Sequence, residues 1–511
     1  MTKTSFSPTG RWVLAASILG SSMAFIDGSV VSVALPVLQE DFGTTAASAQ
    51  WIVEAYQLFL ASLVLVGGSL ADRFGRRKVF SIGTFAFAGA SLACGLAPNT
   101  LTLIAARAAQ GIGGALLVPS SLALLGAAFT PGERGRAVGS WAALTGIAGA
   151  IGPALGGWLV QAVSWRAVFL VNLPIAAVVL WIALRKISES RNPAGGPLDL
   201  AGAGLATFGF GAIVYGLIEG PALGWTNPRG WGSIALGLAG LGALAAVEHR
   251  TRHPMVPLRL FRNRTFTSAN LLTFFLYGAL AATFFFIPFV LIQARGYTPA
   301  QAGAAILPLV LIIAALSRPA GAVADRFGPR LPLTVGPLVS GAGFLLLGFL
   351  PPSGSYAATM LPALSVLGLG MAITVAPLTA TVLNGVPSKD QGAASGISNA
   401  VARVAGLLAV AAFGILAASS FNRALDRGLD TARVSAQTRR LMAPERAKLG
   451  AAKPPAGASA AEAEAVREAV KTALNGAFRV VSIGCAGLAL LSAASAAIGV
   501  SSAKPARARE K

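Results

Sequence analysis

The sequence has few charged residues. Of its 511 residues, only 12% are Asp, Glu, Lys or Arg, about half the share found in an ordinary soluble domain. Apolar residues make up 55%, and the mean hydropathy is +0.69. High hydrophobicity with low charge excludes a disordered chain, and a soluble multidomain enzyme could not bury so much apolar surface. The composition indicates an integral membrane protein.

Cysteine and histidine are almost missing, which excludes several kinds of site. Cys94 and Cys485 lie in apolar segments, so neither a disulfide framework nor a zinc site is expected. His249 and His253 lie in a basic loop without further ligands. No glycine precedes a Lys-Ser or Lys-Thr pair, so the phosphate-binding loop of ATPases is missing. We therefore expect no cofactor and no metal, and we find no nucleophile–base cluster that would indicate an enzyme.

The chain is strongly basic, with a formal net charge of +21. The basic residues form short clusters between apolar segments, which is the pattern that the positive-inside rule produces in membrane proteins. We therefore expect no nucleic-acid partner, and we expect the lipid bilayer to surround most of the chain.

Fourteen segments are long and apolar enough to cross a bilayer as helices, which requires about 20 residues. The expected fold class is an all-α integral membrane protein. The predicted spans are 12–36, 50–70, 79–97, 101–125, 137–160, 165–184, 198–219, 231–248, 267–293, 299–318, 331–350, 357–384, 393–419 and 477–500.

Lys and Arg in the short loops predict the orientation. They gather after the even-numbered spans, whereas the loops after spans 1 and 3 carry none. Both termini are thus expected on the cytoplasmic side of the cytoplasmic membrane. The segment 420–476 is expected outside despite its bases, because long loops cross membranes largely regardless of charge. Its part from Ala456 to Ala473 is expected to form a short amphipathic helix.

A motif occurs twice and predicts how the spans are grouped. Gly68-Ser-Leu-Ala-Asp72-Arg73-Phe-Gly75-Arg76 follows span 2, and Gly321-Ala-Val-Ala-Asp325-Arg326-Phe-Gly328 follows span 10. In two plain six-helix halves the second copy would follow span 8, but it follows span 10. The sequence therefore fits two six-helix halves with an inserted pair of helices between them, since repeated halves are common in secondary transporters. The expected parts are a cytoplasmic N-terminus 1–11, a half 12–184, an inserted pair 185–266, a half 267–500 and a basic tail 501–511.

The motif residues suit a tight cytoplasmic turn. Glycine permits a tight turn and close packing, Asp72 can accept hydrogen bonds from a helix N-terminus, and the arginines can hold carboxylates such as Glu133 or lipid headgroups. The alternative is a basic loop that only fixes topology. In the second copy Pro329 replaces an arginine, so any such contact is expected to be asymmetric.

Several motifs together resemble the major facilitator superfamily, in its drug:proton antiporter branch with fourteen helices. They are the two loop copies, Asp27 with Gly28 in span 1, Arg107-Ala-Ala-Gln110-Gly111 in span 4, the stretch from Gly146 to Gly157 in span 5, and Trp165-Arg166 with Asn172-Leu-Pro174. The resemblance covers nearly the whole chain. It implies a fold of six, two inserted and six helices and export driven by the proton gradient.

The few charged residues inside spans are functional candidates by default. Asp27 is the main candidate for proton coupling, with Arg107 approaching it in one state and leaving it in another. The alternative is a static Asp27–Arg107 pair that joins spans 1 and 4. Glu54 is the second candidate, although it lies near the external end of span 2 and could be hydrated.

Span 5 carries a stripe of small residues, Gly149, Gly152, Pro153 and Gly156. Such a helix can bend and pack tightly, and tight packing alone is the simpler interpretation. Candidates for substrate binding are polar or aromatic residues near the charged positions, together with one residue each from spans 9 and 13. They are Met23, Phe25, Tyr56, Gln110, Tyr277 and Arg403.

These features predict a monomeric, proton-coupled antiporter that exports small amphipathic molecules, cationic ones among them. A dedicated exporter of one endogenous metabolite is the first alternative. A membrane sensor that transports nothing is the second, because a fold does not fix a function.

Overall fold

The computed structural model describes residues 6–191, 199–223, 227–251, 257–351, 354–387 and 390–501, and these residues form helices without strands. Predictions for the other residues, among them the basic tail beyond Ser501, lie outside the described part. The helices of the first half of the chain are α1 (Pro8–Phe42), α2 (Ala46–Phe74), α3 (Arg76–Gly95), α4 (Thr100–Ala128), α5 (Pro131–Ala162), α6 (Ala167–Leu170), α7 (Asn172–Lys186), α8 (Leu200–Leu223) and α9 (Pro228–Arg250).

The second half begins with the short helix η1 and continues to a long final helix. Its elements are η1 (Leu258–Arg262), α10 (Arg264–Phe289), η2 (Val290–Ala294), α11 (Pro299–Ala305), α12 (Leu307–Phe327), α13 (Arg330–Gly348), α14 (Met360–Asn384), α15 (Gln391–Thr431), α16 (Ala436–Leu441), η4 (Glu445–Ala451) and α17 (Ala460–Gly499).

Fourteen helices of the described residues are long and apolar enough to cross a membrane, which confirms the predicted number of spans. Three spans are interrupted. The sixth begins with the short helix α6, and the tenth is divided at Ile306 into α11 and α12. The ninth ends in a π-helical turn, η2, just after Pro288. Pro288 near the end of α10 and Pro308 in the first turn of α12 explain the breaks in the ninth and tenth spans, because proline cannot donate the backbone hydrogen bond that continues a helix.

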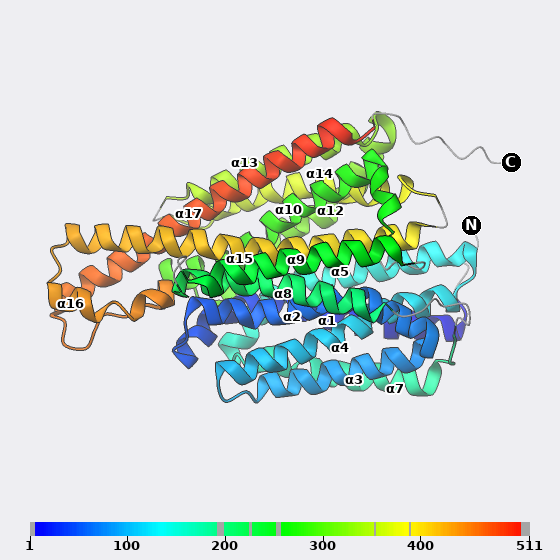
Figure 1. Ribbon diagram of the computed structural model, residues 1–511, viewed down its shortest axis with the longest axis horizontal. Helices are drawn as coiled ribbons and strands as arrows, with labels where there is room; N and C mark the ends of the chain where they lie inside the picture. Colours follow the sequence, from blue (N-terminus) through cyan, green and yellow to red (C-terminus); the bar gives the residue numbers. More distant parts are fainter. Residues whose placement is uncertain are drawn as a thin grey trace. The chain divides into compact units, whose positions relative to one another are not determined.

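The largest difference from the predicted boundaries concerns segment 420–476. Spans 13 and 14 were predicted to end at 419 and to begin at 477, whereas α15 continues to Thr431 and α17 already begins at Ala460. The stretch from Ala456 to Ala473, predicted as a short amphipathic helix, is helical from Ala460 on, but it forms the first turns of the long helix α17 and not a short helix. The two helices run together to α16 (Figure 1). Hydropathy marks only the part inside the membrane, while Ala, Glu and Arg continue a helix readily in water.

The chain forms two compact units. Unit 1 comprises residues 1–38, 51–213 and 233–255, and unit 2 comprises residues 39–50, 214–232 and 256–511. In unit 1, α3 and α4 pack closely because glycines face backbone of the other helix. A Cβ on Gly83 would lie 2.7 Å from the Leu117 nitrogen, and one on Gly113 would lie 2.5 Å from the Phe87 nitrogen. Phe80 and Phe87 fill the core between helices.

In unit 2, glycines likewise allow α13 and α14 to pack closely. A Cβ on Gly343 would lie 2.6 Å from the Leu367 nitrogen, and Gly370 faces the backbone of Ser340. The helix α17 lies along α10, where the Ser492 hydroxyl donates to the Leu272 carbonyl at 3.2 Å. Small residues at helix contacts are typical of proteins in lipid, where helices gain no hydrophobic energy by associating.

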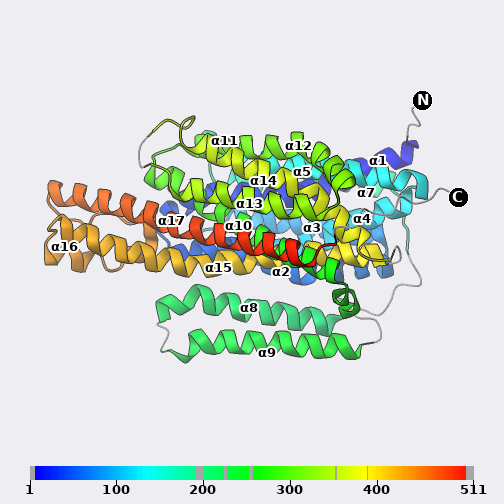
Figure 2. The same ribbon diagram turned by 90° about the horizontal axis from the view of Figure 1, so that it is seen from above.

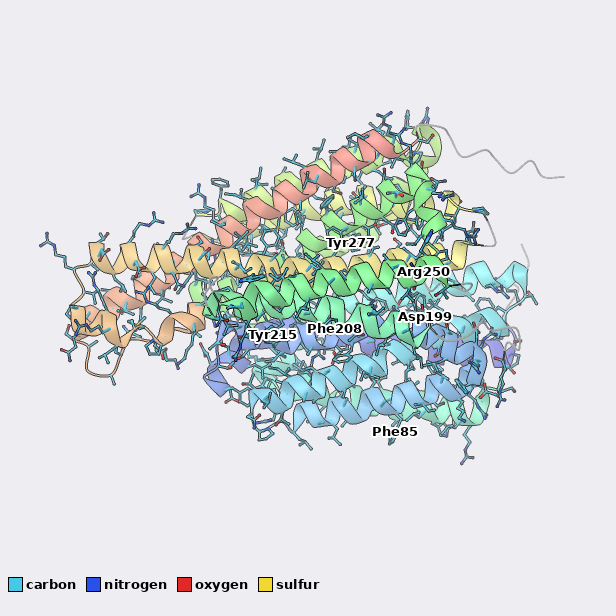
Figure 3. The ribbon with its side chains drawn as sticks, viewed as in Figure 1. Phe85, Asp199, Phe208, Tyr215, Arg250 and Tyr277 are labelled. Carbon is cyan, nitrogen blue, oxygen red and sulfur yellow. The ribbon has the colours of Figure 1, made fainter. Side chains whose placement is uncertain are left out.

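The helices α8 and α9, predicted as an inserted pair, lie side by side as a hairpin (Figure 2). Asp199 and Arg250 mark one end of this hairpin, where Asp199 caps α8 by accepting from the Gly202 N–H at 2.7 Å (Figure 3). Large apolar side chains point outward, among them Phe85, 71% exposed, and Phe208, 55% exposed (Figure 3). Such exposed apolar surface fits contact with lipid tails.

Candidate functional site

The candidate site is a buried ion pair in unit 1. Asp27 on α1 is 0% exposed and Arg107 on α4 is 1% exposed. The structure places the two residues together, and Arg107 Nη1 donates to Asp27 Oδ2. A buried ion pair is tolerated only when further hydrogen bonds satisfy its remaining atoms, and this pair has several.

Three polar side chains complete what we call the carboxylate network, formed by Asp27, Arg107, Gln110, Ser91 and Asn172. Gln110 donates to Asp27 Oδ1 at 2.7 Å and accepts from Arg107 Nη1 at 2.7 Å. Asn172 donates to the same Asp27 oxygen at 3.3 Å. The Ser91 hydroxyl accepts from both amides, at 3.2 and 3.0 Å. The carboxylate thus accepts from three side chains that come from α4 and α7.

Arg107 also has partners that do not depend on Asp27. Its Nε donates to the carbonyl of Ile52 at 3.0 Å. Its guanidinium carbon lies 4.2 Å from the ring centre of Tyr56, within the range of a cation–π contact. The Tyr56 hydroxyl in turn donates to the Ala24 carbonyl at 3.1 Å. Arg107 would therefore keep these two partners if Asp27 were neutral.

Glu54 lies on α2, two residues after Ile52 and two residues before Tyr56. It is 1% exposed, so the structure does not place it in water at a membrane surface. Neither of its carboxylate oxygens has a hydrogen-bond partner among the described residues. Because an ionised carboxylate without partners is costly to bury, this position suits a group that exchanges a proton.

The glycine stripe of α5 packs against the part of α1 that carries Asp27. A Cβ on Gly149 would lie 3.3 Å from Phe25, and one on Gly156 would lie 2.7 Å from the Val30 carbonyl. Gly152 faces the Ser29 hydroxyl even more closely. The stripe therefore allows close packing on the Asp27 helix. Pro153 lies within α5, which continues from Pro131 to Ala162.

The first loop motif forms the tight turn between α2 and α3. Gly75 has a φ of 113°, a region that favours glycine. Asp72 pairs with Arg76 at 2.8 Å, and Arg73 is exposed beside the ring of Phe74. A Cβ on Gly68 would meet only Pro119, at an ordinary contact distance of 3.6 Å.

The carboxylate at this turn that caps a helix is Glu189, which sequence reasoning did not identify. Glu189 accepts from the Arg77 and Lys78 N–H groups at the start of α3, each at 3.1 Å. Glu133, the partner suggested for the arginines, instead accepts from the Thr130 hydroxyl at 2.9 Å.

The second copy forms the same turn in unit 2. Gly328, with a φ of 86°, ends α12, and α13 begins at Arg330. Arg326 lies beside Phe327 as Arg73 lies beside Phe74. The side chain of Asp325 lies outside the described part.

The predicted substrate residues fall into different surroundings. Met23 and Tyr56 belong to the hydrophobic core of unit 1, and Phe25 is half-buried against Gly149. Tyr277 on α10 lines a small cavity of about 110 Å³ in unit 2 with Thr273, Ser395, Ser398 and Asn399 (Tyr277 is labelled in Figure 3). Arg403 is half-buried and follows Ala402, which lines the same cavity.

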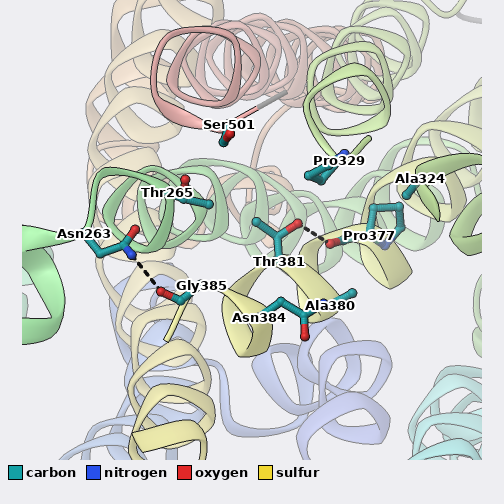
Figure 4. A pocket seen from close by; sticks show the side chains of 10 residues that line it. All are labelled: Asn263, Thr265, Ala324, Pro329, Pro377, Ala380, Thr381, Asn384, Gly385 and Ser501. Atoms are coloured by element: carbon teal, nitrogen blue, oxygen red, sulfur yellow. Dashed lines mark hydrogen bonds between the residues drawn. The ribbon is translucent and has the colours of Figure 1, made fainter. Parts of the chain in front are cut away.

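Another cavity of unit 2, of about 290 Å³, lies beside the second loop copy and includes Ala324 and Pro329 (Figure 4). Two of its polar side chains are already bonded to backbone. Asn263 donates to the Gly385 carbonyl at 2.8 Å, and the Thr381 hydroxyl donates to the Pro377 carbonyl at 2.7 Å. No group of three His, Cys, Asp or Glu that could hold a metal is found among the described residues.

Comparison of the sequence with known proteins gives a consistent result. A family model described as Major Facilitator Superfamily matches residues 17–410. The multidrug resistance protein Stp of Mycobacterium tuberculosis is 37% identical over 82% of this chain and 78% of its own. The tetracenomycin C resistance and export protein of Streptomyces glaucescens is 33% identical over 80% and 76%. The puromycin resistance protein of Streptomyces alboniger is 36% identical over 79% and 81%.

Solved structures support the fold. A bacterial homologue of the human lysosomal transporter Spinster, in an inward-facing and unoccupied conformation, superposes with a TM-score of 0.62. That match covers 96% of this chain and 98% of the other, at 18% identity. Such a likeness shows a shared fold and no more.

Proposed function

The chain belongs to the major facilitator superfamily, and from this premise we propose that it exports amphipathic drugs or toxins in exchange for protons. The proposal places the protein in the cytoplasmic membrane as a monomer, with both termini in the cytoplasm and no cofactor. Transporters of this family are not enzymes, and the multidrug and antibiotic resistance proteins similar to this chain support drugs as the substrate class.

The observation that carries the proposal is the contrast between the two buried carboxylates. Asp27 has an arginine and two amides as donors, whereas Glu54 has none among the described residues. Proton binding at Asp27 would weaken its contact with Arg107, which keeps Ile52 and Tyr56 as partners. A difference in proton affinity between two conformations is the coupling that an antiporter requires.

We propose the following cycle. A substrate enters from the cytoplasm or the inner leaflet while Asp27 and Glu54 are deprotonated, and the protein then opens outward. A proton from outside binds a carboxylate, neutralises it and releases the substrate. The protonated protein returns, and the proton leaves to the cytoplasm. Cationic substrates fit this exchange because a cation and a proton compete for one negative charge.

The cavity around Tyr277 supports amphipathic substrates. It combines an aromatic ring with hydroxyl and amide groups, and its lining carries no ionisable group besides the tyrosine. Its volume of about 110 Å³ is below the roughly 300–1,000 Å³ of a drug-sized site, so this cavity would contact one part of a substrate. In this proposal the charge preference comes from the carboxylates of unit 1.

The test measures ethidium uptake into inside-out vesicles with an imposed pH gradient, comparing the intact protein with Asp27→Asn and Glu54→Gln. We expect gradient-dependent uptake that at least one of these variants abolishes. Gradient-driven uptake that survives in both variants would move proton coupling to another residue and contradict the assignment.

A dedicated exporter of one antibiotic is a second candidate, favoured by the likeness to the tetracenomycin C export protein. The same vesicles separate the two functions. Correctly inserted protein that ignores ethidium but takes up a single compound from a wider screen indicates the dedicated exporter. Absence of all substrate-dependent proton flux would instead support a non-transporting sensor.

A further inference from the structure

Unit 2 holds a larger cavity, of about 300 Å³, whose lining includes no residue of the carboxylate network. It lies where α10 and η2 end and where α15 and α17 continue into segment 420–476. Its walls also include the ends of α1 and α2 within residues 39–50 and the part of α8 around Ile218. The cavity therefore lies at the boundary between the spans and the 420–476 segment.

One wall of the cavity is apolar and aromatic. Phe285, Phe286 and Phe289 from α10 line it, and Leu217 and Ile218 from α8 are also part of its lining. The rings of Phe285 and Phe286 meet edge to face, with centres 4.9 Å apart. Such a wall suits a flat apolar or aromatic group, which gains by leaving water and by contact between rings.

The remaining lining is rich in amide groups that retain hydrogen-bonding capacity. Gln39 donates to the Lys448 carbonyl at 2.8 Å, and Gln293 donates to the Gln39 oxygen at 3.2 Å. The side-chain oxygens of Gln293 and Asn422 are buried and have no donor in the described part of the chain. Because a buried acceptor without a donor destabilises a protein, these oxygens favour a ligand that carries a donor.

Segment 420–476 supplies the last wall through η4, and this wall is held in an unusual conformation. Leu449 lines the cavity with a φ of 52° and a ψ of −122°, which is strained for a residue with a side chain. The bond from Gln39 to the Lys448 carbonyl holds the strained turn on one side. On the other side Glu445 accepts from Lys448 Nζ at 2.6 Å and from the Lys453 N–H at 3.1 Å.

The charge at the cavity is balanced. Arg446 lines it and is paired with Asp426. The lining residues include no carboxylate, so the cavity does not attract a cation strongly. The carboxylate network of unit 1 differs in this respect. A ligand here is selected by its apolar body and its hydrogen-bond donors.

We propose that this cavity is a second binding site, for an uncharged amphipathic molecule with an aromatic or aliphatic body and at least one hydrogen-bond donor. The strained η4 turn and residues 39–50 form its polar side, and α10 forms its apolar side. Both a compound in transit and a membrane lipid have this chemistry. The site does not depend on proton coupling and goes beyond the proposed function.

The test uses N-phenyl-1-naphthylamine, a neutral aromatic amine, and the full-length protein in detergent. Ala418 lines the cavity, so Ala418→Cys places a thiol in it, while native Cys94 and Cys485 are buried. We expect the amine to slow labelling of the introduced thiol by N-ethylmaleimide about tenfold, since a filled pocket excludes the reagent. The matched control is Leu416→Cys, 44% exposed on the same helix, whose labelling should not change.

Further variants decide where the ligand binds. Asn422→Leu in the Ala418→Cys background should raise the amine concentration needed for protection about tenfold, the effect of losing one buried hydrogen bond. Asp27→Asn should leave protection unchanged. Protection that Asp27→Asn abolishes would place the ligand at the carboxylate network and overturn the proposal, whatever the transport assay shows.

A lipid arm separates the two sources of ligand. The labelling is repeated in nanodiscs of uncharged phospholipid without the amine. Protection of the introduced thiol there, but not in delipidated protein, identifies a lipid occupant of the same site. Equal labelling with and without the amine and the lipid would show that the cavity holds only water, and the proposal would be wrong.

Discussion

At the scale of single residues, Glu54 is a side chain of unit 1 that is costly to bury. It is fully buried, and neither oxygen has a partner among the described residues, whereas Asp27 accepts from three side chains. Natural proteins retain such groups at functional sites at the expense of stability. We therefore expect that replacing Glu54 by an apolar residue raises the stability of the protein and that replacing Asp27 lowers it.

We predict that Glu54→Met stabilises the folded protein by about 1–3 kcal/mol, the cost of an unsatisfied buried polar group, while it lowers proton-driven ethidium uptake. The measurement is thermal unfolding in detergent, followed with a thiol-reactive dye that reports exposure of buried Cys94 and Cys485. The control is Asp27→Leu, which leaves the Arg107 charge buried and should lower stability. A Glu54→Met protein less stable than the parent would contradict this prediction.

The sequence predicts part of the carboxylate network. Asp27 and Arg107 stand out because charges inside spans are few, and Gln110 follows Arg107 on the same helix face. Ser91 and Asn172 were missed as site residues, because a neutral polar residue in an apolar span has no spacing that identifies its partner. The available signal for Asn172 was that a polar amide inside an apolar span needs a hydrogen-bond partner.

At the scale of elements, α5 depends on glycine where it packs against α1. The positions differ sharply, because a Cβ on Gly156 would contact Val30 whereas one on Gly146 would meet open space. The same helix thus contains a test position and its own control.

We predict that Gly156→Ala lowers the free energy of unfolding by about 1–3 kcal/mol, the usual cost of overpacking, and slows transport. Gly146→Ala should be neutral or slightly stabilising, because alanine favours a helix over glycine by up to about 1 kcal/mol. Thermal unfolding and vesicle uptake of both variants check this. Equal effects at the two positions would show that α5 does not require close packing on α1.

The η4 turn should respond to pH through Glu445. Burial alone raises the pKa of Glu445, but hydrogen bonds from Lys448 and Lys453 and their charges lower it below the ordinary value of 4.5. Because its pKa is lowered, ionised Glu445 stabilises the turn at pH values above the ordinary pKa of 4.5. This stabilisation is lost as the pH falls through the lowered pKa.

We predict that a nitroxide on Ala447→Cys becomes more mobile as the pH falls from 6 to 3. With Glu445→Gln in addition, the label should be mobile at every pH. Electron paramagnetic resonance line shapes measure this mobility, and the same label on exposed Ala456→Cys is the control. A label at 447 that stays immobile at pH 3 would show that Glu445 does not hold the turn.

Helix boundaries show where sequence reasoning ends. Hydropathy predicts all fourteen spans, because each must cover the same apolar thickness. It missed the extensions of α15 and α17, whose residues such as Glu464 and Arg467 pair with one another at the surface. It also missed the break at Ile306, although Pro308 in the first turn of α12 was an available signal.

At the scale of the whole molecule, the orientation in the membrane remains a prediction from the basic loops. Ala456, in segment 420–476, and Ser188, after α7, are both exposed and belong to loops predicted on opposite sides. Cysteines at the two positions can report the side on which each loop lies.

We predict that a membrane-impermeant maleimide labels Ala456→Cys on intact cells and labels Ser188→Cys only after the cells are permeabilised. The reason is the excess of Lys and Arg in the loops after even-numbered spans. Labelling of both positions on intact cells, or the reverse pattern, would contradict the proposed orientation. The buried native cysteines make the parent protein an unlabelled reference.

The long hairpin of α15 and α17 has a practical consequence for imaging. α15 has 41 residues, which at about 1.5 Å per residue span roughly 60 Å, while the hydrocarbon layer is about 30 Å thick. Small membrane proteins are difficult to align in electron micrographs, because a detergent belt hides most of their features. A hairpin that extends beyond that belt provides an asymmetric landmark, so each particle carries its own marker for orientation.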